Sequence, residues 1–250
     1  MAWQKLLNKY IGREGFLTPS GDAAIEMALK HLSGQGYTSC LIPDQGGWLS
    51  YRKLPEKYGL KLIEVPTDYG LIDPNQLKRL LTEKSMLLLN SIAGYAAPQP
   101  MREITEACRK AKTLLINDVS GSIGTPAALY GDLILGSFGR WKPVDLGKGG
   151  FIAGIDTKSV ELPGLEEKLM KLKERLAFLH DLCKQVKEDL AGMEIIHREK
   201  QGLVVIVAYD DDAEKRKIIE YCKGKEYDHT ECPRYIRVMR QAISIEVKRK

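Results

Sequence analysis

The chain has 250 residues, of which 44% are hydrophobic and 28% charged, and its formal net charge is +5 at pH 7. No window approaches the roughly 18 apolar residues that a membrane-spanning helix requires, and the first residues lack a secretion or import signal, so we expect a cytoplasmic protein without a membrane segment. Lysine and arginine are dispersed among glutamate, which argues against a nucleic-acid-binding surface.

Short apolar runs alternate with amphipathic stretches over the first part of the chain. The runs, which we expect to be strands, span residues 38–43, 61–66, 85–90, 113–118, 132–138 and 149–155. Apolar residues at three- and four-residue spacing predict helices at residues 22–32, 74–82 and 101–111. Several runs are apolar on both faces, as in strands that helices cover on both sides. This rhythm predicts an α/β fold with a mostly parallel sheet flanked by helices.

The pattern changes at Leu162, where leucines at helical spacing predict one long connector helix as far as Leu190. Beyond it, the segments MEIIHR, GLVVIVAY, RYIRV and AISIEVK read as strands, and a charged helix is expected at about residues 212–223. We therefore predict two domains, an α/β domain over residues 1–161 and a connector helix with a small α+β domain over residues 162–250.

The cysteines and histidines give no sign of a metal site. The five cysteines lie far apart without a CxxC pair, which argues against both a zinc site and a disulfide framework. The four histidines have no ligand spacing. We expect reduced, buried cysteines and no bound metal.

Lys142 and Asp118 both follow predicted strands. A lysine becomes a nucleophile only where burial or neighbouring charge lowers its pKa, and a solvated loop lysine is the simpler interpretation of Lys142 taken alone. Asp118, however, ends the strand TLLIND. In a parallel sheet both residues would leave the same carboxyl edge, where ligands of open α/β folds bind.

Two further features point to the same edge. In TPSGDAAIEM, Ser20, Gly21 and Asp22 open a helix whose free N–H groups could bind a phosphate, although an ordinary helix cap explains them equally. Trp48, after the strand at residues 38–43, could stack on a flat ring, with Tyr51 as the reserve and core packing as the alternative.

A lysine, a strand-end aspartate and a helix-start anion site are the three anchors that pyridoxal 5'-phosphate (PLP) needs. The lysine forms an imine with the aldehyde of PLP, the aspartate places a carboxylate at the ring nitrogen, and the helix start binds the phosphate. Their order along the chain, cradle then acid then lysine, also fits.

Most of residues 15–155 resembles the DegT/StrS-type sugar aminotransferases among the fold-type I PLP enzymes. Ser137 and Phe138 precede Lys142, and GKGG at 147–150 follows it, with the spacing of that family. The resemblance implies that Lys142 forms the Schiff base and that Asp118 pairs with the pyridinium. It also implies that Ser137 joins Gly21 and Asp22 at the phosphate, and that the protein is a homodimer.

The sequence departs from the family at three points. Gly121 stands where a His or Gln usually contacts the cofactor's phenolic oxygen, so Ser120 or Ser122 would have to substitute. Asp22 replaces the usual Thr, and because a carboxylate repels phosphate we expect its side chain to cap the helix instead. The segment between the GKGG strand and the connector helix is also shorter than the family's, which affects substrate contacts.

The predicted function is that of a PLP-dependent enzyme, an aminotransferase, acting on a small amino compound. Arg237, with Arg234 and Arg240 nearby, is the candidate for binding a substrate carboxylate, and surface ion pairing is the alternative. Other functions stay open: a PLP-dependent lyase or desulfurase, a synthase with a tRNA-linked substrate that the basic charge balance would suit, or a cofactor-binding protein without catalysis.

Overall fold

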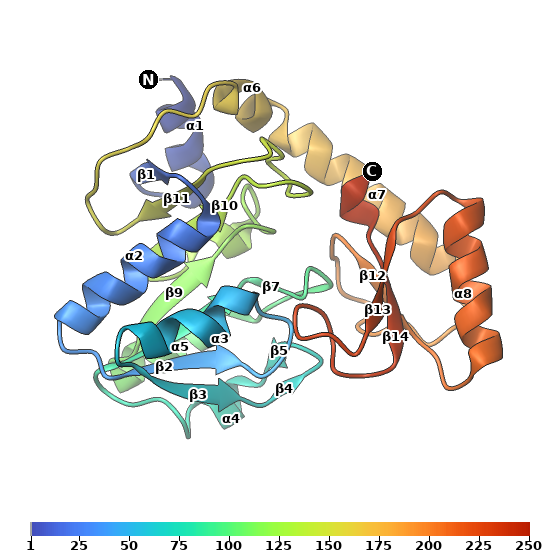
Figure 1. Cartoon of the computed structure of the whole chain (residues 1–250), viewed down its shortest axis with the longest axis horizontal. Helices are drawn as coiled ribbons and strands as arrows, with labels where there is room; N and C mark the ends of the chain where they lie inside the picture. The colour runs from blue at the N-terminus through green and yellow to red at the C-terminus, as the bar shows by residue number, and fades with distance from the viewer. Residues whose placement is uncertain (1) are drawn as a thin grey trace.

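The computed structural model describes residues 2–250. A large sheet with its helices forms one part, and a small C-terminal unit, orange to red in Figure 1, forms the other. Two helices, α6 (Leu165–Met170) and α7 (Leu172–Asp189), run between them (Figure 1).

The large sheet has seven strands in the order β1-β11-β10-β9-β6-β2-β3. Five neighbouring strands, from β10 to β3, are parallel, and β11 alone runs against both of its neighbours. The predicted α/β fold with a mostly parallel sheet is therefore confirmed. The strands are β1 (Gly15–Thr18), β2 (Ser39–Pro43), β3 (Lys61–Val65), β6 (Ser85–Asn90), β9 (Leu114–Asp118), β10 (Leu133–Ser137) and β11 (Gly150–Ala153).

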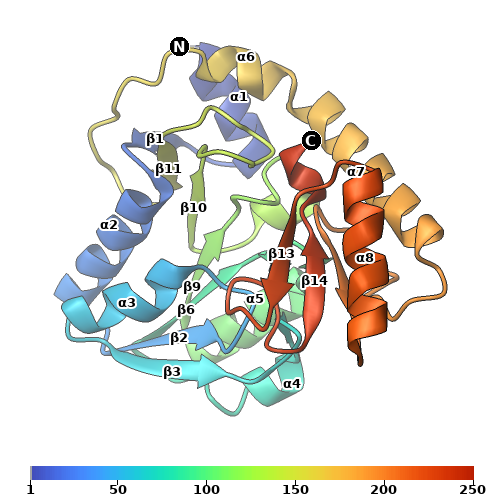
Figure 2. The ribbon, with the colours of Figure 1, turned by 45° about the vertical axis from the view of Figure 1, so that its right-hand side comes forward.

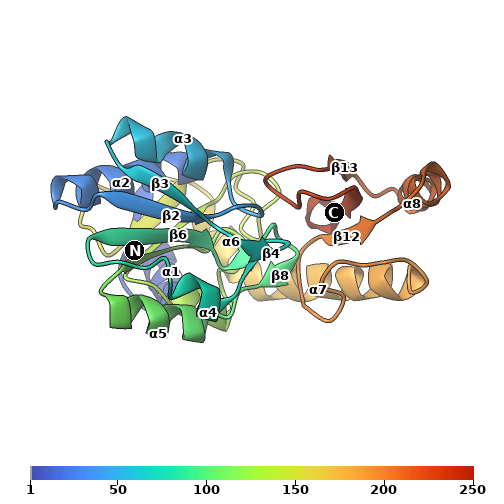
Figure 3. The same cartoon turned by 90° about the horizontal axis from the view of Figure 1, so that it is seen from below.

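Helices cover both faces of this sheet, which is why its central strands are apolar on both sides. Seen from below in Figure 3, α2 (Gly21–Gly34) and α3 (Leu49–Lys57) lie on one face, and α4 (Pro74–Leu77) and α5 (Met101–Ala111) on the other. Each pair buries its own hydrophobic cluster against the strands. All six residues of β6 are buried between these two layers.

Several elements differ from the sequence-based expectation. The helix expected at residues 74–82 ends at Leu77, because the chain tightens there into a turn in which Leu80 N donates to Leu77 O. Helix α1 (Ala2–Ile11), strand β1 and helix α3 were not predicted. Two short hairpins were also missed: β4 (Thr67–Asp68) with β5 (Leu71–Ile72), and β7 (Ile92–Ala93) with β8 (Ala97–Pro98).

The connector is two helices rather than one. Lys171 separates α6 from α7 with a ψ of −3°, which is outside the range of a regular α-helix. The leucine stripe nevertheless faces the interior on both sides of the break. Its buried members are Leu165, Leu169, Leu172, Leu176, Leu179 and Val186.

The C-terminal unit is a three-stranded antiparallel sheet in the order β12-β14-β13, with α8 (Asp212–Gly224) alongside β14 (Figure 2). Its strands are β12 (Val205–Ala208), β13 (His229–Cys232) and β14 (Ala242–Ile245), followed by a 3₁₀ turn, η2 (Val247–Arg249).

Two of the expected C-terminal strands are wrong. RYIRV is a loop, because Pro233 has no N–H with which to continue the ladder of β13. MEIIHR makes only one isolated bridge, from Ile195 to Val207. The division into residues 1–161 and 162–250 stays a prediction. Within residues 2–250, no helix combines the length and the apolar character that crossing a membrane requires.

Candidate active site

A cavity of about 380 Å³ lies where strand ends of the large sheet meet the start of α2 and the C-terminal unit. All of the side chains and the glycine predicted for the site line this cavity: Ser20, Gly21, Asp22, Trp48, Asp118, Ser120, Ser137, Lys142 and Arg237. The fold therefore brings them together from six separate stretches of chain. Their individual roles stay predictions.

Asp118 is buried at the end of β9, where the strand register places it beside Asn90 and Leu135. Its Oδ1 accepts a hydrogen bond from Ser120 N at 2.9 Å, and its Oδ2 accepts one from the Tyr51 hydroxyl at 2.7 Å. Burial, followed by the charge of Asp118, raises the pKa of Tyr51 well above its usual value, so this hydroxyl remains a donor. Tyr51, the reserve candidate for the aromatic lid, is thus fully buried behind Asp118.

The start of α2 packs directly against Ser137. A Cβ added at Gly21 would lie 2.6 Å from Ser137 Cβ, so only glycine permits this approach. Ser137 N donates to Ser120 Oγ at 2.8 Å, which joins the ends of β9 and β10. The positive end of the helix and the Ser137 hydroxyl therefore face the same side of the cavity, the arrangement that suits an anion.

The expectation that Asp22 caps α2 is wrong. Ser20 is the cap, because its extended backbone (φ −162°) directs Oγ to Ala23 N at 3.0 Å. Asp22 lies within the first turn instead, where Oδ1 accepts hydrogen bonds from Trp48 Nε1 at 2.8 Å and from Ser50 Oγ at 2.6 Å. Asp22 thus fixes the indole ring at the edge of the cavity.

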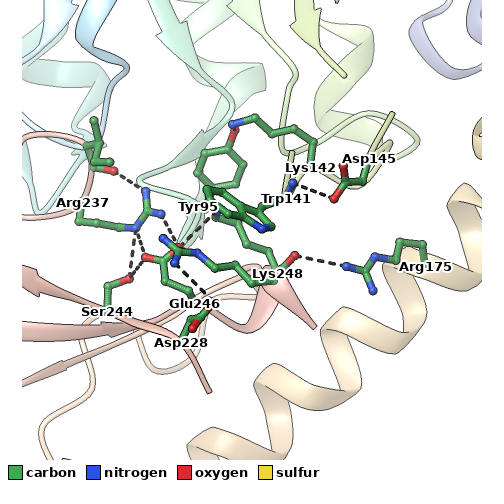
Figure 4. A network of polar contacts seen from close by, with 12 residues as sticks. Tyr95, Trp141, Lys142, Asp145, Arg175, Asp228, Arg237, Ser244, Glu246 and Lys248 are labelled. Carbon is green, nitrogen blue, oxygen red and sulfur yellow. Dashed lines mark hydrogen bonds and ion pairs between the residues drawn. The ribbon is translucent and has the colours of Figure 1, made fainter. Parts of the chain in front are cut away.

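Lys142 extends toward Tyr95, a residue that the sequence analysis did not select (Figure 4). Lys142 Nζ lies 2.6 Å from Tyr95 Oη and 5.3 Å from the centre of the Trp48 ring. The ring of Tyr95 also explains Gly121, since a Cβ there would lie 2.9 Å from Tyr95 Cε1. Gly121, a glycine where the family usually has a side chain, was the sequence feature that could have indicated a bulky neighbour such as Tyr95.

The two serines expected to substitute for a side chain at position 121 have other partners. Ser120 Oγ accepts from Ser137 N, and Ser122 Oγ hydrogen-bonds Ser91 Oγ at 2.6 Å in the interior. Of the two, Ser120 lines the cavity.

Arg237 is held from behind by Glu246 (Figure 4). Its Nε and Nη2 donate to the two carboxylate oxygens of Glu246 at 2.9 and 2.7 Å, and both side chains are almost fully buried. Burial alone would raise the pKa of Glu246, but the charge and hydrogen bonds of Arg237, together with the charge of Lys248, lower it to about 2. Arg237 also lines the cavity, and its Nη1 donates to Ile236 O at 2.8 Å.

The last residues of the chain also reach the site, which the sequence analysis missed. Lys248 is buried, lines the cavity and lies 3.3 Å from Glu246 Oε2. Burial lowers the pKa of Lys248 to about 8. The negative charge of Glu246, which Lys248 shares with Arg237, offsets this effect only in part. The only available signal was the basic run KRK that ends the sequence.

Other features bear on which groups the site can hold. Asn90 lines the cavity, and its buried Oδ1 has no hydrogen-bond partner among residues 2–250, so the cavity offers a bound group an unused acceptor.

No cluster of three or more side chains suited to a metal ion occurs in residues 2–250. The cysteines are buried free thiols, as expected, and none lines the cavity; burial raises the pKa of Cys40, Cys108 and Cys183 to about 12.

Comparison with known proteins gives two family matches. The model of the DegT/DnrJ/EryC1/StrS aminotransferase family matches residues 2–194. The model of the C-terminal domain of the MJ1341 family matches residues 173–249, the part that carries Arg237, Glu246 and Lys248. No curated protein matches the chain.

Solved structures share the fold over nearly the whole chain. 3-Amino-5-hydroxybenzoic acid synthase superposes with a TM-score of 0.74 at 12% identity, over 99% of this chain and 84% of that one. A putative sugar aminotransferase from Streptococcus pneumoniae, in its PLP form, gives 0.75 at 13% identity over 98% and 85%. The apo cysteine desulfurase from Thermococcus onnurineus gives 0.73 at 13% identity over 99% and 79%. At these identities the likeness concerns the fold alone.

Proposed function

The chain belongs to the DegT/DnrJ/EryC1/StrS aminotransferase family, and on this basis we propose that it is a PLP-dependent aminotransferase acting on a small amino compound. The observation that carries the proposal is that Lys142, Asp118, Ser137 and the start of α2 line one cavity at the carboxyl edge of the sheet. An amine, a carboxylate and an anion site in one cavity are the groups that PLP requires.

The residues present fit this cofactor. Lys142 would hold its aldehyde, Asp118 its ring nitrogen, and Ser20, Gly21, Asp22, Ser120 and Ser137 would surround its phosphate. When bound, PLP supplies an electron-withdrawing ring that eases removal of a proton from the substrate carbon.

The protein contributes orientation and proton transfer. Tyr51 and the Ser120 amide fix both oxygens of Asp118, which keeps the carboxylate aimed at one place in a buried site. Trp48, held by Asp22, lines the cavity, where its ring would lie over the cofactor and limit access of water. Lys142, once released by an amino substrate, is the amine that would carry the transferred proton.

The test is the covalent link to Lys142. Protein purified with PLP should show visible absorbance from the lysine-bound cofactor, and borohydride should fix the cofactor to the peptide that contains Lys142. Lys142→Ala should abolish that labelling, whereas Lys148→Ala, in the same loop but outside the cavity lining, should retain it. Protein that neither binds PLP nor is labelled at Lys142 would refute the proposed function.

Substrate screening distinguishes the aminotransferase from the other candidate functions. A desulfurase needs a thiolate that can reach the substrate, and the buried cysteines with raised pKa values do not offer one. Spectral change with free amino compounds supports an aminotransferase. Change only with aminoacyl-tRNA would indicate a tRNA-linked synthase, and no change with any amine would indicate a binding protein.

We also propose that the protein is a homodimer, which sedimentation equilibrium would test.

A further inference from the structure

Tyr95 stands at the centre of the charged groups in the cavity. It lies in the turn between β7 and β8, and its side chain is almost fully buried. The ammonium groups of Lys142 and Lys248 lie 4.7 and 5.2 Å from the centre of its ring, and the guanidinium carbon of Arg237 lies 5.6 Å away. Figure 4 shows Lys142 reaching its hydroxyl while Lys248 passes beside the ring.

The hydroxyl of Tyr95 has a particular relation to Lys142. Among residues 2–250 it is the only hydrogen-bond partner of Lys142 Nζ, at 2.6 Å. No carboxylate in that part of the chain forms an ion pair with this lysine. A proton that leaves or reaches the amine must therefore pass through Tyr95 Oη or go directly to water in the cavity.

The backbone holds Tyr95 in a rarely used conformation. Its φ of 64° is in the left-handed region, which non-glycine residues seldom adopt. Its carbonyl oxygen accepts hydrogen bonds from Leu203 N and Val204 N, so the segment that leads into β12 fixes the turn. Non-glycine residues persist in this region only where the surroundings impose it, and they cluster at functional sites.

The ring of Tyr95 also fills the space that a side chain at position 121 would need. A Cβ at Gly121 would lie 2.9 Å from Cε1 of Tyr95, closer than a Cβ approaches a neighbouring atom, and 3.0 Å from Cδ1. Gly121 has an ordinary negative φ, so its backbone does not require glycine. The glycine is needed because the ring occupies the place of a side chain at position 121.

From this geometry we propose that Tyr95 is a catalytic residue that relays protons to and from the Lys142 amine. The inference rests on the proposed function, in which Lys142 bonds to the cofactor. In the relay, one N–H bond of the Lys142 ammonium breaks, and its proton passes to Tyr95 Oη. The original phenolic proton passes from Oη to a water molecule in the cavity. The N–H electron pair stays on Nζ, so the lysine becomes a free amine and the tyrosine keeps one proton.

Nothing is oxidised or reduced in this step, and its reverse returns a proton to the amine when the substrate has displaced it. The other ionisable groups that face Tyr95 are Lys248 and Arg237 from the C-terminal unit and Tyr51 from α3. Since Lys248 can titrate near neutral pH, with a pKa of about 8, the test must separate its contribution.

The first test measures the amine itself, without the cofactor. In cofactor-free protein with ¹⁵N-labelled lysine, exchange of the Lys142 Nζ protons with water is followed by NMR across a range of pH. Tyr95→Phe keeps the ring and removes the relay, so we expect proton exchange at Lys142 to slow about tenfold. Lys248→Met in the same assay shows how much of the pH profile belongs to that lysine.

The second test uses the loaded enzyme. Tyr95→Phe should lower kcat about 100-fold, the lower end of the range for a general acid or base, with a much smaller change in KM. Tyr10→Phe is the matched control, because it removes a buried hydroxyl that donates to Leu169 O outside the cavity lining. Gly121→Ala should displace the ring and reproduce part of the loss, with no additional loss when combined with Tyr95→Phe.

Tyr95→Phe with the proton-exchange rate and the kcat of the wild type would overturn the relay. A higher KM and a lower stability with an unchanged kcat would overturn it too. If instead the wild-type protein fails to bond PLP through Lys142, the proposed function fails. In that case the proton-exchange experiment still reports whether Tyr95 carries protons to the amine, so the two failures can be told apart.

Discussion

The Tyr51 hydroxyl donates a 2.7 Å hydrogen bond to Asp118 Oδ2 in the interior of the protein. Tyr51 comes from α3, after the second strand of the sheet, whereas Asp118 ends the strand at the centre. The bond therefore connects two layers of the domain at the floor of the cavity. It also places a neutral donor behind the carboxylate, which leaves the negative charge of Asp118 available on the side of the cavity.

Replacing Tyr51 with Phe should weaken both the fold and cofactor binding. The substitution leaves Asp118 with the Ser120 amide as its remaining donor, and an unsatisfied buried acceptor costs about 1–3 kcal/mol. We expect a loss of that size in the free energy of unfolding and roughly tenfold weaker PLP binding, measured by denaturant titration and by cofactor titration. Tyr58→Phe, whose hydroxyl bonds Glu26 at the surface of α2, is the control and should bind PLP like the wild type.

Gly21→Ala should damage the phosphate cradle. The added Cβ would lie 2.6 Å from Ser137 Cβ and 3.2 Å from its Cα, so the start of α2 must move away from β10. We expect PLP to bind at least about tenfold more weakly, since moving a helix N-terminus removes N–H donors from the anion. Gly34→Ala, at the other end of the same helix with no atom within 4 Å of the new Cβ, should leave PLP affinity unchanged. Equal affinities in the two variants would contradict this account of the cradle.

The sequence was informative where local chemistry and strand order determine position. Asp118 and Lys142 could be assigned to one edge because Asp118 ends one apolar run and Lys142 follows another, and parallel strands place such ends together. Ser137 followed from the family resemblance, which has this serine before the lysine. The α/β class followed from strands that are apolar on both faces.

The parts that could not be predicted depend on packing between distant segments. Tyr95 reaches Lys142 because Leu203 and Val204 of the C-terminal part fix the short hairpin that carries it. The hydrophobic periodicity of the sequence does not predict such a contact. Lys248 follows the last strand, where a basic residue would ordinarily lie in solvent. RYIRV has strand propensity throughout, yet Pro233 and the pairing of Arg237 with Glu246 hold it as a loop.

Glu246→Gln should destabilise the protein at neutral pH more than at low pH. The folded-state pKa of about 2 lies below the ordinary value of 4.5, so the carboxylate contributes stability above pH 4.5 and loses it as the pH falls toward 2. The difference corresponds to about 3 kcal/mol, and breaking a buried ion pair typically costs about 3–5 kcal/mol. Denaturant titrations at pH 7, 4 and 3 should show the gap between variant and wild type shrinking as the pH decreases.

The matched control is Glu64→Gln, which breaks the half-exposed ion pair of Glu64 with Arg52. Because water screens such pairs, this variant should stay close to the wild type at every pH. A gap for Glu246→Gln that is constant with pH would mean that packing, not the charge of Glu246, holds the C-terminal sheet.

Asp22→Asn should strengthen binding of the phosphorylated cofactor. The amide oxygen can still accept from Trp48 Nε1 and Ser50 Oγ, so the indole ring should keep its place while the negative charge is removed from the helix start. Two unit charges about 4 Å apart in water interact by about 1 kcal/mol, so we expect roughly fivefold tighter PLP binding. Pyridoxal without its phosphate provides the control ligand, and its affinity should not change. A gain for both ligands would place the effect in the ring contacts of Trp48, and a loss for PLP would mean that Asp22 does not face the phosphate.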